Sequence, residues 1–302
     1  MRWNIFLSII FIIFVMGLFF SYLFLPFNQI QFAKKTGNNF NFSSINSSMQ
    51  FYTNMRFPDK IITYKISNCP LQKENDMKSA FDDMAGRTIL LFNSVSENED
   101  ISITCDSGQK TAENENGVFI AGEGGPTEVL KTPLFNIILH GKILLIRQSE
   151  CMSSNIATHE LLHVLGFDHS ANPSNIMYPV SNCDQVVSDD ISDLIDQLYT
   201  IDSKSDLSLD NISASIKGRY LDCEINILNQ GLKKSEQAEI LIYNKDNLVK
   251  RIDLRPINIG EGLKITLRNL WIYNPIELKF MINSSFDELD KENNQATLEI
   301  IK

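Results

Sequence analysis

The distribution of apolar residues sets the N-terminus of the chain apart. Residues 5–27 form an unbroken run of 23 uncharged, mostly apolar residues. As a helix, this run would span about 34 Å, against roughly 30 Å of bilayer hydrocarbon. Trp3 before the run and Tyr22 near its end suit the membrane interface. We therefore expect residues 1–27 to form an N-terminal transmembrane helix.

A cleaved signal peptide is the alternative interpretation of this run. The apolar region of a signal peptide has about 7–15 residues and ends in small residues. This run is longer and ends in Phe27 with no Ala-x-Ala, so the pattern favours an uncleaved anchor. Basic residues leave the orientation open, because Arg2 lies before the run and Lys34 and Lys35 lie after it.

The pattern beyond the anchor changes twice. Residues 28–55 are rich in Asn and Ser and predict a flexible tether. In residues 56–200, mixed periodicities predict strands at 61–66, 89–92 and 101–105 and helices at 72–88, 154–165 and 188–199. In residues 201–302, short alternating segments predict an all-β sandwich, with strands at 223–228, 238–243, 263–267, 276–282 and 296–301.

Glycines mark two further features of residues 56–200. Residues 121–126 contain three glycines and a proline and predict a loop. Residues 135–140 and 142–147 predict a hairpin with Gly141 at or near its turn. The expected fold class is therefore α+β, a mixed sheet with three helices, followed by the sandwich.

The net charge limits the possible binding partners, and the cysteines indicate the cellular compartment. The net charge of −10 argues against nucleic acid, because phosphate binding requires basic patches. Two disulfides among four cysteines that lie in residues 56–200 would suit an oxidising exterior; these are Cys69, Cys105, Cys151 and Cys183. Burial as small apolar residues is the alternative, and it is the role we expect for Cys223 in a strand.

Three of the four histidines lie within eleven residues, His159 to His169. His159 and His163 are four apart, so on a helix both imidazoles leave the same face and can bind one Zn²⁺. Gly166 allows the chain to leave the helix and return His169 as a third ligand. Glu160 can take a proton from zinc-bound water, which makes it the candidate general base.

A second motif follows at residues 174–179. Met177 predicts an apolar floor beneath the three imidazoles, and Tyr178 is close enough in sequence to shape a substrate pocket. Together, the segment 159–199 resembles the matrixin branch of the metzincin zinc endopeptidases, with Asp168-His169-Ser170, Ile176-Met177-Tyr178-Pro179 and Asp189-Asp190-Ile191 as the similar residues.

This resemblance implies a matrixin-like fold for residues 56–200 and cleavage of polypeptides that bind in an extended pose along the sheet edge. We expect that edge within residues 135–146, with the backbone near Gly141 pairing with substrate. Only His140 remains for a second zinc site, so one catalytic Zn²⁺ is expected, and Ca²⁺ is left open. Residues 28–55 contain no cysteine that could act as a latency switch.

The C-terminal region resembles CARDB-type sandwiches in residues 205–207, 227–231 and 288–294. Its acidic residues could bind Ca²⁺, with a solvated acidic loop as the alternative; they are Asp287, Glu288, Asp290 and Glu292.

The sequence thus predicts a membrane-anchored, extracellular zinc-dependent endopeptidase. Zinc-activated water would hydrolyse the peptide bond with Glu160 as general base. A surface adhesion or scaffold protein with a catalytically idle metalloprotease domain is the alternative, and the motif alone also allows hydrolysis of a non-peptide substrate.

Overall fold

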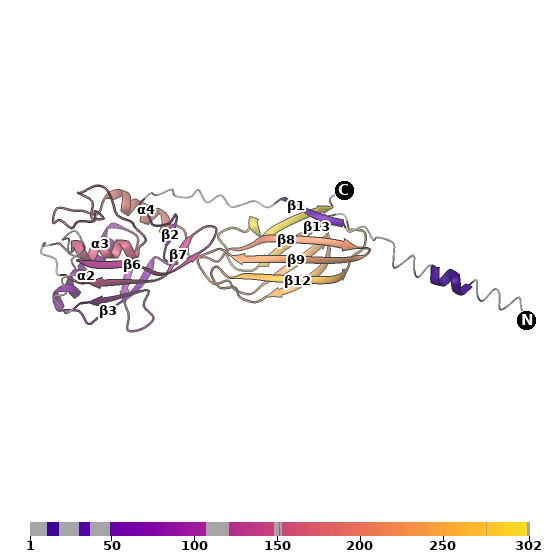
Figure 1. Ribbon diagram of the computed structural model, residues 1–302, viewed down its shortest axis with the longest axis horizontal. Coiled ribbons are helices and arrows are strands. Elements are labelled where there is room, and N and C mark those ends of the chain that lie inside the picture. The colour runs from indigo at the N-terminus through magenta and orange to yellow at the C-terminus, as the bar shows by residue number, and fades with distance from the viewer. Residues whose placement is uncertain are drawn as a thin grey trace, which may run out of the picture.

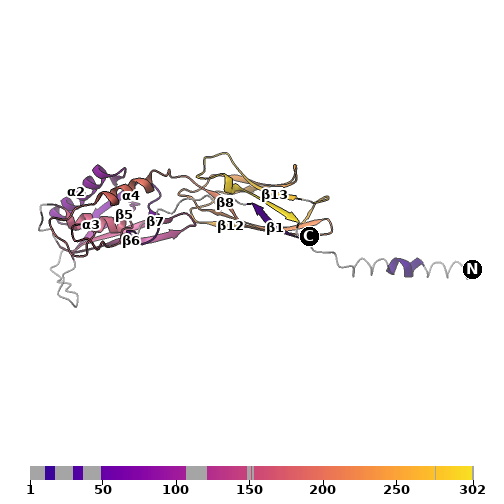
Figure 2. The same ribbon diagram turned by 90° about the horizontal axis from the view of Figure 1, so that it is seen from above.

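The computed structural model describes residues 11–17, 30–36, 49–106, 121–147, 151, 153–275 and 277–300. Two domains with separate hydrophobic cores lie end to end along the long axis (Figure 1, Figure 2). Of the apolar run 5–27, only residues 11–17 are described, and they are helical; the rest of the expected transmembrane helix lies outside the described residues. Within the described ranges, no helix is long and apolar enough to cross a membrane.

The first domain is built on one mixed sheet with the strand order β2-β7-β5-β3-β4, and β6 pairs with β7 on the other side. All pairs are parallel except β6–β7. The strands are β2 Met55–Arg56, β3 Ile61–Ser67, β4 Leu91–Ser94, β5 Ile101–Cys105, β6 Gly122–Lys131 and β7 Asn136–Leu145. The helices are α2 Leu71–Arg87, α3 Asn155–Val164 and α4 Asp189–Tyr199.

Strands β6 and β7 show that two predictions were wrong. The glycine-rich residues 121–126 are not a loop, because all but Ala121 belong to β6. No hairpin turns at Gly141, which lies in the middle of the continuous strand β7. A Cβ at Gly141 would lie only 2.3 Å from Val164 Cγ1, so this glycine lets α3 pack closely on the strand.

The carboxyl ends of the central strands are fixed by a buried lysine and a disulfide. Lys73 Nζ donates hydrogen bonds of 2.9–3.1 Å to the carbonyls of Asp106, Leu145 and Ile146, which follow or end β5 and β7. The Cys69–Cys105 disulfide joins the ends of β3 and β5. These links hold together the sheet on which α3 lies.

The second domain is a sandwich of antiparallel strands in the order β11-β10-β13-β14-β1-β8-β9-β12. Buried and more exposed residues alternate along β9, as expected for a strand with one face on the core, and Cys223 is buried there. The strands after the first domain are β8 Leu207–Lys217, β9 Tyr220–Asn229, β10 Ala238–Asn244, β11 Asn247–Leu254, β12 Gly262–Trp271, β13 Glu277–Ser284 and β14 Gln295–Ile300. A 3₁₀ turn, η1, spans Glu292–Asn294.

Strand β1, Ile30–Thr36, corrects part of the tether prediction. It lies between β14 and β8 and pairs with both. Without it, β14 and β8 would each be an edge strand in this order. Strand β1 covers residues 297–300 of β14 and residues 215–216 of β8. Residues 37–48 lie outside the described residues.

The two domains meet through a third apolar cluster. Phe135 and Ile137 of the first domain are buried with Leu232 of the sandwich, and Leu130 and Ile259 pack against them. The Thr132 hydroxyl also donates to the Gln230 carbonyl at 3.2 Å. The tip of the β6–β7 hairpin is therefore docked on the end of the sandwich.

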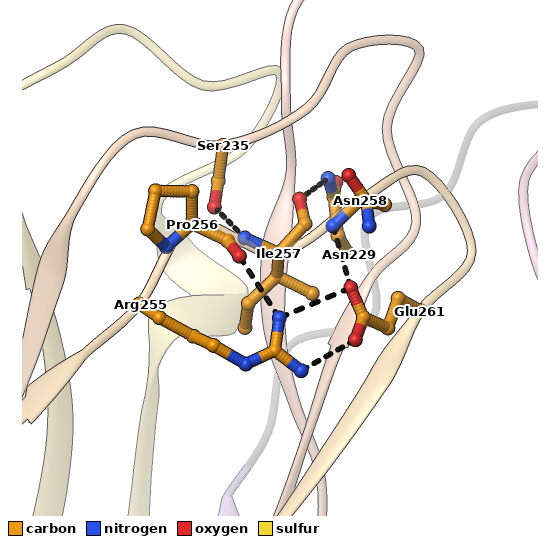
Figure 3. A network of polar contacts seen from close by, with 7 residues as sticks. All are labelled: Asn229, Ser235, Arg255, Pro256, Ile257, Asn258 and Glu261. Carbon is orange, nitrogen blue, oxygen red and sulfur yellow. Dashed lines mark hydrogen bonds and ion pairs between the residues drawn. The ribbon is translucent and has the colours of Figure 1, made fainter.

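The sandwich loop that receives this hairpin is held by a polar network (Figure 3). Asn229 Nδ2 donates to the Ile257 carbonyl at 3.0 Å, and the Ser235 hydroxyl accepts from the Ile257 N–H at 2.8 Å. Arg255 pairs with Glu261, whose carboxylate also accepts from the Asn258 N–H at 2.9 Å. These contacts fix the loop that carries Ile259 and Gly260 against Leu130.

Candidate metal centre and active site

Helix α3 carries the first two histidines one turn apart and ends where the motif predicts. The Phe167 N–H donates to the Leu162 carbonyl and the Gly166 N–H to the His163 carbonyl, both at 3.0 Å. This pair of bonds, with Gly166 at φ +97°, is a Schellman C-cap. The glycine thus turns the chain back towards α3 and brings His169 to the other two histidines.

The three imidazoles converge. His163 Nε2 and His169 Nε2 are 3.2 Å apart, close to the roughly 3.3 Å expected for two nitrogens on one tetrahedral zinc. One ring nitrogen from each of His159, His163 and His169 lies within 4.8 Å of the other two. In the part of the chain that the structure describes, no other group of His, Cys, Asp or Glu has this spacing.

The remaining ring nitrogens orient the histidines. His159 Nδ1 lies 2.7 Å from the Ile176 carbonyl and His163 Nδ1 lies 2.8 Å from the Phe167 carbonyl. Because carbonyls only accept, each Nδ1 carries the proton and each Nε2 keeps its lone pair free for a metal. The donor set therefore fits Zn²⁺, with room for a non-protein ligand.

The protonation of these histidines also suits a metal. Burial lowers the pKa of His159, and burial lowers the pKa of His163 to about 4, although the bond to the Phe167 carbonyl acts in the opposite direction. Both rings are therefore neutral at pH 7, which is the form that binds metal.

Glu160 lies where α3 meets strand β6. Burial, followed by repulsion from Glu123, raises the pKa of Glu160 to about 7, while a hydrogen bond from the Gly124 N–H lowers it. A Cβ at Gly122 would lie 2.8 Å from Glu160 Cγ, and one at Gly124 would lie 2.3 Å from the Glu160 carbonyl oxygen. The β6 glycines therefore let the strand backbone approach the candidate base directly.

The turn around Met177 supports the histidines through its backbone. The Ile176 carbonyl accepts from His159, and the Met177 carbonyl accepts from the Ser170 N–H at 2.8 Å, next to His169. Asn175 shapes the turn by accepting from the Met177 N–H at 2.8 Å. Met177 itself belongs to the buried core.

The segment that precedes β2 is a part of the site that sequence reasoning missed. The Asp168 N–H donates to the Met49 carbonyl at 2.8 Å, and the Phe51 N–H donates to the Gly166 carbonyl at 2.9 Å. The Phe51 ring stacks on His163 at 5.8 Å between centroids. Residues 49–55 are thus not part of a tether but cover the turn between the second and third histidines. The apolar residues that interrupt the Asn/Ser-rich run could have indicated from the sequence that this segment packs on the domain.

Other predicted residues fall outside the histidine cluster. The Cys151–Cys183 disulfide links the segment before α3 to the loop after Met177. Tyr178 is half-buried in that loop, and its role in a pocket stays a prediction. The expected substrate edge within residues 135–146 was wrong, because β7 has partners on both sides. Among the described strands, β6 pairs only with β7, as β2 does, and β4 pairs only with β3. Of these edge strands, β6 is the one that lies against Glu160 of α3.

The acidic residues 287–292 give no support to the calcium expectation. The Glu288 carboxylate accepts from the Leu207 N–H at 2.7 Å and from Asn294 Nδ2 at 2.9 Å, as well as from the Ser284 hydroxyl. Asp290 Oδ1 accepts from the Glu292 N–H at 2.7 Å. Glu288 therefore serves the sandwich itself.

Comparison with known proteins agrees with this geometry. The family model of matrixins matches residues 56–200, whereas none of the curated proteins matches the chain. Residues 56–200 therefore form a matrixin-like domain, and this match supports a zinc metalloendopeptidase.

Three solved structures are similar in fold. They are high choriolytic enzyme 1, a hatching zinc-protease from the medaka Oryzias latipes (23% identity, 37% of this chain and 46% of that chain, TM-score 0.23), myroilysin (14%, 38% and 52%, TM-score 0.24), and the CARDB domain of a Pyrococcus furiosus protein in complex with di-metal ions (12%, 33% and 90%, TM-score 0.26). The chain spans about half the length of the two proteases that it matches. At these TM-scores the three structures add nothing to the family match.

Proposed function

We propose that this chain is a membrane-anchored endopeptidase that uses one zinc ion to cleave extended polypeptides outside the cytoplasm. The observation that carries the proposal is the convergence of His159, His163 and His169 next to a buried carboxylate, Glu160, at an open sheet edge. Three imidazole ligands leave one position on a tetrahedral metal, which is the arrangement of catalytic rather than structural zinc sites.

The residues of the site have complementary roles in this proposal. His159, His163 and His169 hold Zn²⁺, which when bound supplies Lewis-acid chemistry to the attacking water and to the carbonyl that is cleaved. Glu160 accepts the proton of the attacking water and returns it to the leaving amine. The raised pKa of Glu160 suits both steps, because a group that accepts and then returns a proton works best when its pKa is near the working pH.

The open edge of β6 accounts for an extended substrate. A peptide that adds to this edge would form main-chain hydrogen bonds and continue the sheet. Because Gly124 of β6 contacts Glu160 directly, such a peptide would lie beside the candidate base. The β6 edge thus supports selection of polypeptides over small esters or amides.

Two features support a location outside the cytoplasm. The Cys69–Cys105 and Cys151–Cys183 disulfides are typical of oxidising compartments. The uncharged run 5–27 is long enough to anchor the chain in a membrane.

The test is the Glu160→Gln variant of the full chain, compared with Glu128→Gln, an exposed carboxylate on β6, as a matched control. We expect kcat/KM for a casein-like substrate to fall by about 10²–10⁴-fold in Glu160→Gln, because a general base is lost, and to change little in Glu128→Gln. Both variants should retain one zinc per chain by metal analysis. A wild-type protein that holds zinc and binds a hydroxamate probe, yet cleaves no peptide, would favour the idle-domain alternative.

A further inference from the structure

The end of the sandwich that lies away from the first domain exposes a group of aromatic side chains. Tyr220, Trp271 and Tyr273 are 51%, 57% and 67% exposed. Tyr220 and Trp271 are directly paired between β9 and β12, and the rings of Trp271 and Tyr273 stack at 6.4 Å. Three large rings in contact with solvent form a surface that the fold itself does not explain.

Basic side chains surround these rings. Lys217, Arg219 and Arg268 are exposed at the same end, on a chain whose net charge is −10. We call this group the distal patch; it consists of Lys217, Arg219, Tyr220, Arg268, Trp271 and Tyr273. Asp222, Asp246 and Glu277 lie at this end as well, so the aromatic rings, more than net charge, distinguish it.

The chain enters the sandwich next to the distal patch. Strand β1 begins at Ile30, which pairs with Ile216, one residue before Lys217. Strand β14 ends beside the start of β1, because Ile300 pairs with Phe32. Position 30 is only three residues beyond Phe27, where the mostly apolar run ends. Three residues reach at most about 10 Å.

The short distance between Phe27 and Ile30 determines which surface can face the distal patch. The headgroup layer on each side of a bilayer is roughly 5–8 Å thick. If the run 5–27 spans the membrane, as the proposed function holds, the first strand of the sandwich begins at or just above that layer. Tyr and Trp are the residues enriched at this depth, since their rings are apolar and their polar groups remain hydrated.

We infer that the distal patch docks on the headgroup region of the bilayer in which the chain is anchored. The partner is a lipid surface, and the inference rests on the membrane anchor of the proposed function. The sandwich then stands on the membrane, and a ten-residue strand such as β9 separates the two ends of the sandwich by about 33 Å. The metal centre would be held away from the lipid, facing polypeptides beyond the surface.

The chain offers a direct test, because it contains only two tryptophans, Trp3 and Trp271. In the Trp3→Phe variant of the full chain, Trp271 is the sole tryptophan and reports its own environment. After reconstitution into phosphatidylcholine vesicles, we expect about twofold lower Trp271 emission when the lipids carry bromine near the headgroup end of the acyl chains. Addition of anionic lipid should change this little.

The matched control moves the tryptophan to the opposite end of the molecule. Leu71 is 73% exposed at the start of α2, so a chain with Trp3→Phe, Trp271→Phe and Leu71→Trp should show no quenching. Equal quenching at positions 271 and 71, in chains that still float with the vesicles after a carbonate wash, would overturn the docking and leave the anchor intact. Chains that no longer float would overturn both the anchor and the docking, while peptide cleavage would be unaffected.

Discussion

In the matrixin-like domain the buried charged side chains lie on α3, at the start of α2 and at the end of β2, whereas in the sandwich they lie where the two domains join. Glu160 and His163 belong to the first group. Asp206 and Glu288 belong to the second, together with the buried amides of Asn229 and Gln230. The apolar strands of the sandwich beyond this joint bury mostly Ile and Leu.

The buried polar side chains of the two domains differ in how many of their hydrogen-bonding positions are used. All four hydrogen-bonding positions of the fully buried Asn229 side chain are used, by the N–H groups of Asp206 and Gly231 and the carbonyls of Lys233 and Ile257. Glu160 instead sits at an open sheet edge with a pKa of about 7. A network in which every polar group is hydrogen-bonded fixes the geometry of the joint. A carboxylate with a pKa near 7 can instead exchange protons during a reaction.

Removal of the Cys69–Cys105 disulfide should produce the largest effect on stability, and only in the matrixin-like domain. The double variant Cys69→Ser, Cys105→Ser opens a loop with a sequence separation of 36, which should lower the free energy of unfolding by about 4 kcal/mol. Hydrogen exchange should show faster opening of β3 and β5, with β8 and β9 unchanged. The Cys223→Ser variant is the control, and equal loss of protection in both domains would contradict the prediction.

Outside the three histidines and Glu160, the close contact between β6 and α3 should be the point at which a substitution lowers activity most. In Gly124→Val, the new Cβ would have to displace the Glu160 backbone, from which it would be only 2.3 Å away. A shift of about 1 Å at a catalytic group can cost on the order of 10²-fold in rate. We expect kcat/KM to fall by that factor with zinc content retained.

Gly125 provides the matched control for this variant, because a Cβ there meets nothing within 4 Å. Gly125→Val should keep activity within about twofold, since a change that removes no contact has little effect. Similar activity in both variants would show that β6 does not position Glu160.

The contact between the two domains should also affect substrate binding at the β6 edge, but less than the contact between β6 and α3 affects activity. Leu232→Ala removes a fully buried side chain from the cluster around Phe135 and should cost about 2–3 kcal/mol. Because this cluster holds the β6–β7 hairpin, we expect faster hydrogen exchange in β6 and a higher KM for long peptides. Leu248→Ala, at an exposed position of β11, is the control. An unchanged KM with a lower stability would limit the joint to a structural role.

The convergence of the three histidines was predictable because its geometry is local. One helical turn relates His159 to His163, and a Schellman turn at Gly166 brings back His169, so spacing alone specifies the cluster. The helices at 72–88 and 188–199 were likewise confirmed within one residue at each end, since their apolar faces repeat at helical spacing.

The parts that the sequence did not reveal depend on neighbours that are distant in the chain. Gly122 and Gly124 form a strand because α3 approaches them closely, which composition alone does not indicate. Strand β1 exists because β14 and β8 offer open edges on either side. Residues 49–55 are ordered by the turn at Gly166–Asp168. In each case tertiary contacts override a local preference for loop.

The smallest expected effect lies in the sandwich and depends on pH. Burial, with the negative charges of Glu288 and Asp290 as lesser causes, raises the pKa of Asp206 to about 6, although Asn293 and Gln230 donate hydrogen bonds to it and lower the pKa. Because the folded-state pKa lies above the ordinary value of 3.8, folding favours the protonated form. The stability that this carboxyl contributes is therefore fully present below about pH 4 and is lost as the pH rises through about 6.

We expect the unfolding free energy of the sandwich to fall by roughly 2 kcal/mol from this group between pH 4 and pH 7. Asp206→Asn should flatten that part of the profile, because the amide does not titrate. Asp253→Asn, an exposed position on β11, should leave the profile as in the wild type. Denaturant titrations at several pH values, followed by hydrogen exchange in β8, measure the slope. If Asp206→Asn kept the wild-type slope, the Asp206 carboxyl would not be the group that makes the joint sensitive to pH. Asp206 could then no longer be contrasted with Glu160 as a buried carboxyl that affects stability rather than chemistry.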